Sequence, residues 1–186
     1  MSIVFQYPKE HKKVIILRDG AKVLLRPELS TDTNMLWEMF STLSKESLRF
    51  LVGPFTRERI QGWTNNINYD RVLPIVGVVE EKGKTRIVAS ATLSFFEAPA
   101  DKHKAELGIT VHDDYQNKGL GTALTGHMVE IAKKRGLRKV SLRVLTENGK
   151  AIHMYEKCGF KIEARLREEH FVNEKYYDDY IMSLSL

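Results

Sequence analysis

The stretch "QNKGLGTALTGHM", residues 116–128, decides how this chain folds. Leu120, Leu124 and Met128 recur every four residues, which predicts an amphipathic helix. Gly119 and Gly121 lie where that helix begins, although a glycine costs a helix interior about 1 kcal/mol against alanine. Because a helix start presents unpaired N–H groups, and glycine lets an anion approach them closely, the stretch indicates a phosphate site.

Two common phosphate-binding patterns do not fit this stretch. The Rossmann fingerprint needs a third glycine where this chain has Leu124. The P-loop needs Gly-Lys-Ser/Thr, which does not follow either glycine. What the chain has is Gln-x-x-Gly-x-Gly over residues 116–121, after a strand expected to end at Val111.

The elements around this stretch predict a strand–helix–strand unit. "KAELGITVH" before it and "KVSLRVL" after it are typical strands. The helix is expected to end near Arg135-Gly136, because basic residues and a glycine are typical of a helix C-terminus. Such a unit is expected to be parallel and right-handed.

The remaining segments complete the order ββααβββαβαββ. This order predicts an α/β fold with a mixed sheet covered by helices, in a single domain over 1–186 with an extra strand or hairpin at about 1–22. The other expected elements are a hairpin around Asp19-Gly20, helices over "STDTNMLWEMFSTLS" and "TRERIQGWTNNI", a hairpin around Lys82-Gly83, a short helix from Asn148 to Gly159 and a final hairpin around Asn173-Glu174.

The glycine stretch resembles the pyrophosphate-binding motif of the GNAT superfamily, the GCN5-related N-acetyltransferases. A second signature of that family follows in the right order, as Asn148, Ala151, Tyr155, Gly159 and Phe160. The resemblance runs from about residue 85 to 186. It implies the GNAT-like acyl-CoA N-acyltransferase fold, a mostly antiparallel sheet with a splayed parallel central pair, flanked by helices. The Asp19 hairpin departs from the family, which usually opens with one strand.

The resemblance also implies an acetyl-CoA-dependent N-acetyltransferase. Backbone N–H groups of the glycine loop would hold the diphosphate, and those near Ile109 to Val111, where the family's strand usually bulges, would stabilise the oxyanion. Asn148 would contact the pantetheine arm, cap its helix, or do both. The residues expected to bind acetyl-CoA are Ile109, Thr110, Val111, Gln116, Asn117, Lys118, Gly119, Leu120, Gly121, Thr122, Asn148, Ala151 and Tyr155.

Two side chains are expected to move protons. Glu106 is the expected base, because several members of the family remove the amine proton with a glutamate at this kind of position, often through water. By alternation Glu106, Gly108 and Thr110 share one strand face. Tyr155 is the expected acid for the leaving thiolate, because a phenol with a pKa of about 10 suits that donation. The alternatives are a solvated or ion-paired glutamate and a core tyrosine.

Other chemistry is not indicated by the sequence. His103, His112, His127 and His153 lack metal-ligand spacing with Cys or carboxylates, so no metal is expected. Cys158 has no convincing His–Asp arrangement and is interpreted as a small buried residue rather than a nucleophile.

Composition bounds the surroundings of the protein. The 186 residues hold one cysteine, so no internal disulfide can form. Neither a signal-peptide core nor an apolar run of about 20 residues is present, so we expect a cytoplasmic protein outside the membrane. The formal charge is +5, yet the basic stretch 116–143 has no Phe, Tyr or Trp, which argues against a nucleic-acid partner. A monomer or a homodimer is expected.

The acceptor is expected to be a primary amine, namely a protein lysine or an N-terminal amine. The segment "SKESLRFLVGP" resembles one in GNAT domains of bacterial and archaeal protein-lysine acetyltransferases. A small amine of polyamine or amino-acid type and a non-catalytic CoA-binding module stay open as alternatives. Trp37, Met39 and Phe40 are expected in the core or the acceptor wall. The final hairpin offers carboxylates among aromatics, as a cation site or a solvated edge: Glu168, Glu169, Tyr176, Tyr177, Asp178, Asp179 and Tyr180.

Overall fold

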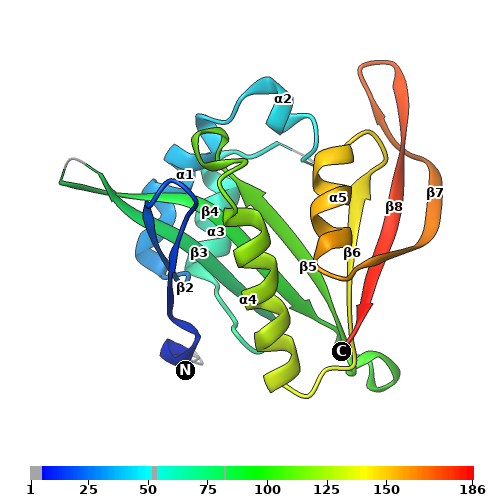
Figure 1. Ribbon diagram of the computed structural model, residues 1–186, viewed down its shortest axis with the longest axis horizontal. Helices are drawn as coiled ribbons and strands as arrows, with labels where there is room; N and C mark the ends of the chain where they lie inside the picture. The colour runs from blue at the N-terminus through cyan, green and yellow to red at the C-terminus, as the bar shows by residue number, and fades with distance from the viewer. Residues whose placement is uncertain (1–5, 52–53, 82) are drawn as a thin grey trace.

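Eight strands form one sheet in the order β1-β2-β3-β4-β5-β6-β8-β7 (Figure 1). The computed structural model describes residues 6–51, 54–81 and 83–186. The strands are Lys13–Ile16 (β1), Lys22–Pro27 (β2), Val72–Glu81 (β3), Lys84–Phe95 (β4), Lys104–Val111 (β5), Lys139–Leu145 (β6), Lys161–Val172 (β7) and Lys175–Ser185 (β8). The helices are Thr33–Ser41 (α1), Lys45–Leu48 (α2), Arg57–Asn65 (α3), Leu120–Lys134 (α4) and Gly149–Lys157 (α5).

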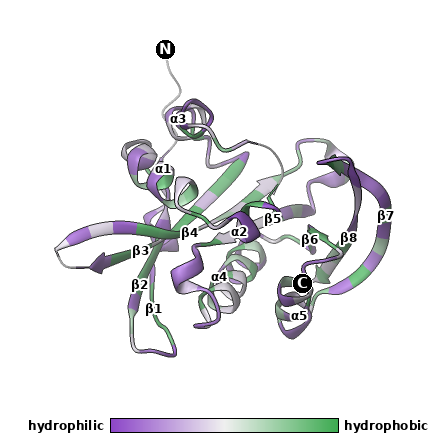
Figure 2. Ribbon diagram, turned by 90° about the horizontal axis from the view of Figure 1, so that it is seen from above, coloured by the Kyte–Doolittle hydropathy of each residue, from purple (hydrophilic) through white to green (hydrophobic). Residues whose placement is uncertain are grey.

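Helices cover both faces of the sheet. Figure 2 shows α1 and α3 on one side and α4 and α5 on the other. Strand β3 is buried along most of its length because neighbouring side chains face different helices. Val76 and Val78 pack with Leu36 of α1, whereas Ile75 and Val79 belong to the core that contains Leu124 of α4.

The central strands β5 and β6 form the parallel pair, and all other strand pairs are antiparallel. Their ladder runs only from Lys104 opposite Lys139 to Glu106 opposite Ser141. Both strands continue past this point, to Val111 and Leu145, without further pairs. The sheet therefore opens between β5 and β6, as the resemblance implies, and the mixed sheet flanked by helices is confirmed.

Three details differ from the sequence-based expectations. The bulge expected near Ile109 to Val111 is absent from the β4–β5 register, which runs without a shift from Ala89 opposite Val111 to Phe95 opposite Ala105. Cys158 is half-buried rather than fully buried. The segment "SKESLRFLVGP" contains the short helix α2, which the sequence did not indicate.

Parts of two expected features lie outside the described residues, namely Lys82 in one hairpin turn and residues 52–53 in "SKESLRFLVGP". The N-terminal hairpin is present as β1 and β2, and it turns at Gly20 with a φ of 85°. Within the described chain, every helix falls short of the length and apolar character that a membrane crossing needs.

Candidate active site

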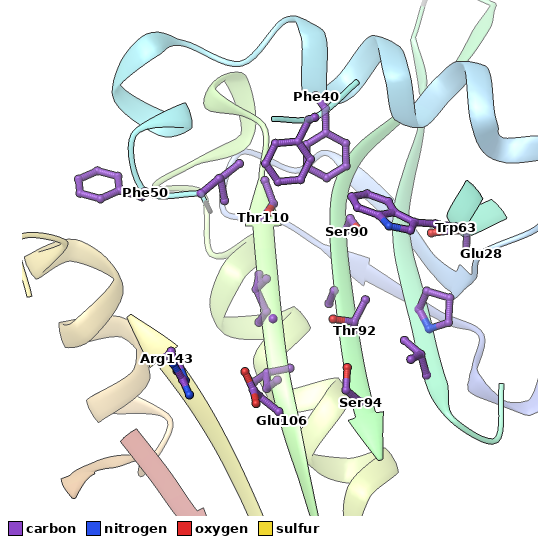
Figure 3. Close-up of a pocket in the computed structure, with 18 of the residues that line it drawn as sticks. Glu28, Phe40, Phe50, Trp63, Ser90, Thr92, Ser94, Glu106, Thr110 and Arg143 are labelled. Atoms are coloured by element: carbon purple, nitrogen blue, oxygen red, sulfur yellow. The ribbon is translucent and has the colours of Figure 1, made fainter. Parts of the chain in front are cut away.

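A cavity of about 1040 Å³ lies at the opening between β5 and β6 (Figure 3). Residues 106–110 of β5 line one wall and residues 143–145 of β6 line another. Helix α5 contributes Ala151 and Tyr155, and α1 and α3 contribute Phe40 and Trp63. The cavity therefore reaches from the α5 side of the sheet to the α1 and α3 side, which suits a reaction between two separately bound molecules.

Polar side chains from β4 and β5 share one cavity wall. The register places Ser94 opposite Glu106 and Ser90 opposite Thr110, and Figure 3 shows these side chains on the same face. Gly108 lies between Glu106 and Thr110, as alternation predicts. Glu106 is half-buried and makes no hydrogen bond or ion pair with the described residues. Its carboxylate is thus available to a ligand in the cavity.

Backbone groups of β5 also face the opening. The N–H of His112 donates to the carbonyl of Val88, so the backbone groups of His112 face β4. This orientation alternates along a strand, which turns the backbone groups of Ile109 and Val111 away from β4 and toward β6. The side-chain amide of Gln116 donates a hydrogen bond from its Nε2 to the Val111 carbonyl at 3.0 Å. The N–H groups of Ile109 and Val111 therefore suit an oxyanion or an amide of a ligand, without the expected bulge.

Tyr155 reaches the cavity from α5. Its side chain is 6% exposed and packs against the Phe160 ring with centroids 5.8 Å apart. Its hydroxyl has no hydrogen-bond partner among the described residues. Burial raises the pKa of Tyr155 above its ordinary value, so the phenol stays protonated at neutral pH and can donate. Asn148 caps this helix, because its side chain accepts the N–H of Ala151 at 3.2 Å.

The glycine loop forms a nest of free N–H groups at the start of α4. Asn117 and Gly119 adopt left-handed conformations, with φ of 60° and 91°. The N–H of Ala123 bonds to the Gly119 carbonyl, whereas those of residues 120–122 have no acceptor in the described part of the chain. Alternating left-handed residues before a helix make an anion-binding concavity.

Gly121 lies in the first turn of α4, close to Met154 of α5 and to Val111 at the end of β5. A Cβ on Gly121 would lie 3.8 Å from the Met154 methyl group of α5 and 4.0 Å from a methyl group of Val111. These are ordinary contact distances, so the glycine chiefly leaves the neighbouring backbone N–H groups uncovered, and the loop residues suit the diphosphate of acetyl-CoA.

The predicted residues fall into two adjoining groups. Those that line the cavity are Glu106, Ile109, Thr110, Asn148, Ala151 and Tyr155. Those that form the loop beside it are Val111, Gln116, Asn117, Lys118, Gly119, Leu120, Gly121 and Thr122.

The acidic residues of the final hairpin do not gather at the cavity. Asp178 pairs with Arg165 at 2.6 Å, and Glu169 pairs with Arg143. Only Asp179 lines the cavity, where it is 3% exposed. One of its oxygens lies 3.0 Å from Nε2 of His170, and the other is buried without a partner among the described residues. His170 was not identified from its sequence context.

Glu28 is a second cavity residue that sequence reasoning missed. It is 4% exposed, and its Oε1 is buried without a partner in the described structure. Burial, together with the nearby Asp32 carboxylate, raises the pKa of Glu28 to about 7. Asp32 itself is held by Arg26 in a bidentate pair at 2.6 and 2.7 Å. The only sequence signal was an acid directly after a strand.

An aromatic cluster forms the cavity wall opposite α5. Phe40 and Phe55 stack with centroids 4.5 Å apart, and Trp63 meets both rings edge-on. The Arg59 guanidinium lies 5.3 Å from the Trp63 ring centroid, so the cluster already receives one cation. Phe40 thus belongs to the wall, whereas Met39 is buried in the core.

No metal centre is built from the described side chains. Within residues 6–51, 54–81 and 83–186, His, Cys, Asp and Glu form no cluster of three or more that would hold an ion. His127 lies on the apolar face of α4, and its Nε2 forms a hydrogen bond of 2.8 Å with the His11 carbonyl, which accepts.

The glycine nest, the opened parallel pair and the tyrosine beside it define an acyl-CoA-binding class of protein. A comparison with known families matches residues 36–160 to the acetyltransferase (GNAT) family. The chain belongs to this family.

Individual relatives agree with this assignment. The chain is 34% identical over 102 residues to a spermidine N(1)-acetyltransferase of Vibrio cholerae serotype O1, covering 54% of this chain and 57% of the relative. It is 38% identical over 74 residues to the [ribosomal protein bS18]-alanine N-acetyltransferase of Escherichia coli K12, covering 40% and 49%. These alignments span less than two thirds of either curated relative. The GNAT domain of S. lividans PAT shares the fold, with a TM-score of 0.77 at 22% identity over 97% of this chain and all of that domain.

Proposed function

We propose that the protein transfers the acetyl group of acetyl-CoA directly to a primary amine. The observation that carries this proposal is the cavity at the β5–β6 opening, because it brings Glu106 and Tyr155 to one space beside the glycine nest. Membership of the GNAT family supports the same reaction. When both molecules are bound together, no covalent enzyme intermediate is needed.

Described side chains serve the first deprotonation of the amine and the protonation of the thiolate. Glu106 accepts a proton from the acceptor ammonium, directly or through water, and frees the nitrogen lone pair. The nitrogen attacks the thioester carbonyl, and the N–H groups of Ile109 and Val111 stabilise the oxyanion. The C–N bond forms, the C–S bond breaks, and Tyr155 gives its proton to the leaving thiolate. The nitrogen loses its second proton to solvent, which leaves a neutral amide. Solvent then returns a proton to Tyr155 and takes one from Glu106.

The acceptor that we propose is a protein amine, either a lysine side chain or an N-terminus. A lysine stem is apolar and its head is charged. The aromatic wall of Phe40, Phe55 and Trp63 suits the stem, and Glu106 suits the ammonium group. The family likeness to an enzyme named for a ribosomal-protein alanine supports an acceptor of this kind.

A small polyamine is the second candidate, and a different observation favours it. Three carboxylates, those of Glu28, Glu106 and Asp179, line the same cavity. A ligand with several ammonium groups would satisfy more than one of them, including the buried oxygens of Glu28 and Asp179. The relative named for spermidine supports this alternative.

An acceptor screen with labelled acetyl-CoA tests the proposal. It should compare lysine peptides, peptides with free N-termini, spermidine, amino acids and proteins of a cell lysate. Label transfer to protein or peptide amines supports the first candidate, and transfer to spermidine supports the second. Asp179→Asn should raise the KM of spermidine and leave the acetyl-CoA Kd unchanged. Tight acetyl-CoA binding without transfer to any amine would indicate that the protein is a non-catalytic CoA-binding module.

A further inference from the structure

The tip of the β1–β2 hairpin is attached to the glycine loop (Figure 1). The N–H of Arg18 donates to the carbonyl of Lys118 at 3.1 Å. The Lys118 Nζ lies 2.9 Å from Oδ2 of Asp19. The other Asp19 oxygen accepts the N–H of Ala21 at 3.1 Å and so fixes the turn. The added hairpin is thus held to the proposed phosphate site by both backbone and side-chain contacts.

These contacts partly neutralise the charge of Lys118 in the glycine loop. Lys118 donates to Asp19, which holds the pKa of that carboxyl below its ordinary value. Its ammonium group also lies 5.0 Å from the centroid of the Tyr115 ring. Because Asp19 offsets this charge locally, Lys118 contributes less positive potential to an anion at the loop than its place in the motif indicates.

Arg18 brings a second cation to the same loop. Its side chain is exposed and forms no ion pair or side-chain hydrogen bond within the described residues. A Cβ on Gly119 would lie 3.7 Å from the Arg18 Nε and 3.8 Å from its Cγ. The guanidinium stem therefore runs beside the residue that precedes the free N–H groups of 120–122. A guanidinium is suited to bidentate bonds with a phosphate.

We propose that Arg18 binds a phosphate group of coenzyme A beside the glycine loop, and that this is the role of the added hairpin. This inference rests on the proposed function, since it takes acetyl-CoA as the ligand. Coenzyme A carries a diphosphate and a 3′-phosphate, and both offer the same oxygen chemistry to a guanidinium. Asp19 positions Arg18 by anchoring the turn to Lys118.

Calorimetry with acetyl-CoA tests the inference without any acceptor. Arg18→Ala should raise the Kd about tenfold, as the loss of one charge-assisted phosphate contact predicts. Arg18→Lys should recover part of the affinity, because it keeps the charge and loses the bidentate geometry. Lys22→Ala is the matched control, since it removes one exposed charge from the same hairpin at the start of β2 and should leave the Kd unchanged.

A second ligand identifies the phosphate. If the Arg18→Ala penalty disappears with 3′-dephospho-CoA, Arg18 binds the 3′-phosphate. If the penalty persists, Arg18 binds the diphosphate. Either result supports the inference. Equal Kd values for wild type and Arg18→Ala with acetyl-CoA would overturn it and leave the proposed function standing. Failure of the wild-type protein to bind acetyl-CoA would overturn both.

Folding of the variant is checked separately. The Arg18 side chain has no partner among the described residues, so Arg18→Ala should unfold at the wild-type temperature. If the alanine variant unfolds earlier, Arg18→Gln keeps the first methylene groups and a polar end without the charge, and serves in its place.

Discussion

Glu106 of β5 is opposite Ser141 of β6 on the last rung of the parallel ladder. Beyond this rung the two strands separate and the cavity begins. The proposed base is therefore carried by a paired and stable stretch of strand, while its carboxylate reaches the space where the strands part. This placement holds the side chain firmly without engaging it in an ion pair.

Replacement of Glu106 by glutamine should reduce turnover without weakening coenzyme binding. Loss of a general base lowers kcat between about 100-fold and 10,000-fold. The Kd of acetyl-CoA should stay within about twofold, because the loop contacts do not involve Glu106. Glu163→Gln is the control, since Glu163 is exposed and neither it nor its partner Lys139 lines the cavity. A pH–rate profile of Glu106→Gln that coincides with the wild-type profile would rule out the assignment.

Replacement of Tyr155 by phenylalanine should affect catalysis and not stability. The Tyr155 hydroxyl has no partner in the described structure, so the free energy of unfolding should change by less than about 0.5 kcal/mol. The kcat should fall by about 100-fold or more, because the thiolate loses its acid. Steady-state kinetics measures the kcat, and urea unfolding of the same preparation measures the free energy of unfolding.

Tyr69→Phe is the matched contrast for Tyr155→Phe. The Tyr69 hydroxyl donates to the Glu28 carbonyl at 2.7 Å. Its removal should lower the free energy of unfolding by about 1 kcal/mol or more and change kcat little. Unimpaired turnover in Tyr155→Phe would leave Tyr155 as a core aromatic.

Gly121 is a better position than Gly119 for a substitution that tests ligand binding. Gly119 has a φ of 91°, so any side chain there strains the backbone and confounds a binding test. Gly121→Val should raise the acetyl-CoA Kd more than about tenfold, because the branched side chain covers the free N–H groups of residues 120–122 on the side of Met154 and Val111. Gly126→Val is the control on the same helix, where a Cβ meets nothing within 4 Å.

For these two variants, calorimetry gives the Kd and thermal unfolding gives the stability. Both valine variants should unfold near the wild-type temperature. Equal affinities in Gly121→Val and Gly126→Val would mean that acetyl-CoA does not bind beside Gly121.

Glu28 should make the stability fall as the pH rises. Its pKa is raised from 4.5 to about 7 in the folded protein, so the folded state binds more protons than the unfolded state in that window. The stability that Glu28 contributes is complete below pH 4.5 and is lost as the pH passes about 7. The difference corresponds to about 3 kcal/mol. Glu28→Gln should flatten this fall in denaturant unfolding between pH 5 and pH 8.

Glu38→Gln controls for the removal of a glutamate. Hydrogen bonding from Lys84 lowers the pKa of Glu38, so its contribution changes only below its ordinary pKa. Its removal should leave the slope between pH 5 and pH 8 as it is in the wild type. An unchanged slope in Glu28→Gln would show that Glu28 titrates normally.

The local patterns of the sequence identified most of the fold and half of the candidate site. Spacing placed the α4 face, the α5 cap at Asn148 and the glycine loop, because each depends on residues a few positions apart. Alternation placed Glu106 and Thr110 on one wall of the cavity. The opening between β5 and β6 came from the family resemblance and not from any local pattern.

The missed features depend on contacts between distant parts of the chain. His170 meets Asp179 because β7 shifts its register between Leu166 and His170, where Glu168 takes a φ of 54°. A glutamate in a left-handed conformation has no sequence signal. The contact between Asp19 and Lys118 likewise joins two segments that no local spacing relates.

The free N–H groups of residues 120–122 also provide a way to measure how much of the protein has acetyl-CoA bound. An amide without an acceptor exchanges its hydrogen with heavy water quickly, and a bound diphosphate would slow that exchange. Mass spectrometry of the peptide around residues 116–124 would therefore register acetyl-CoA directly. Occupancy of the site becomes measurable by isotope uptake before any acceptor amine is known.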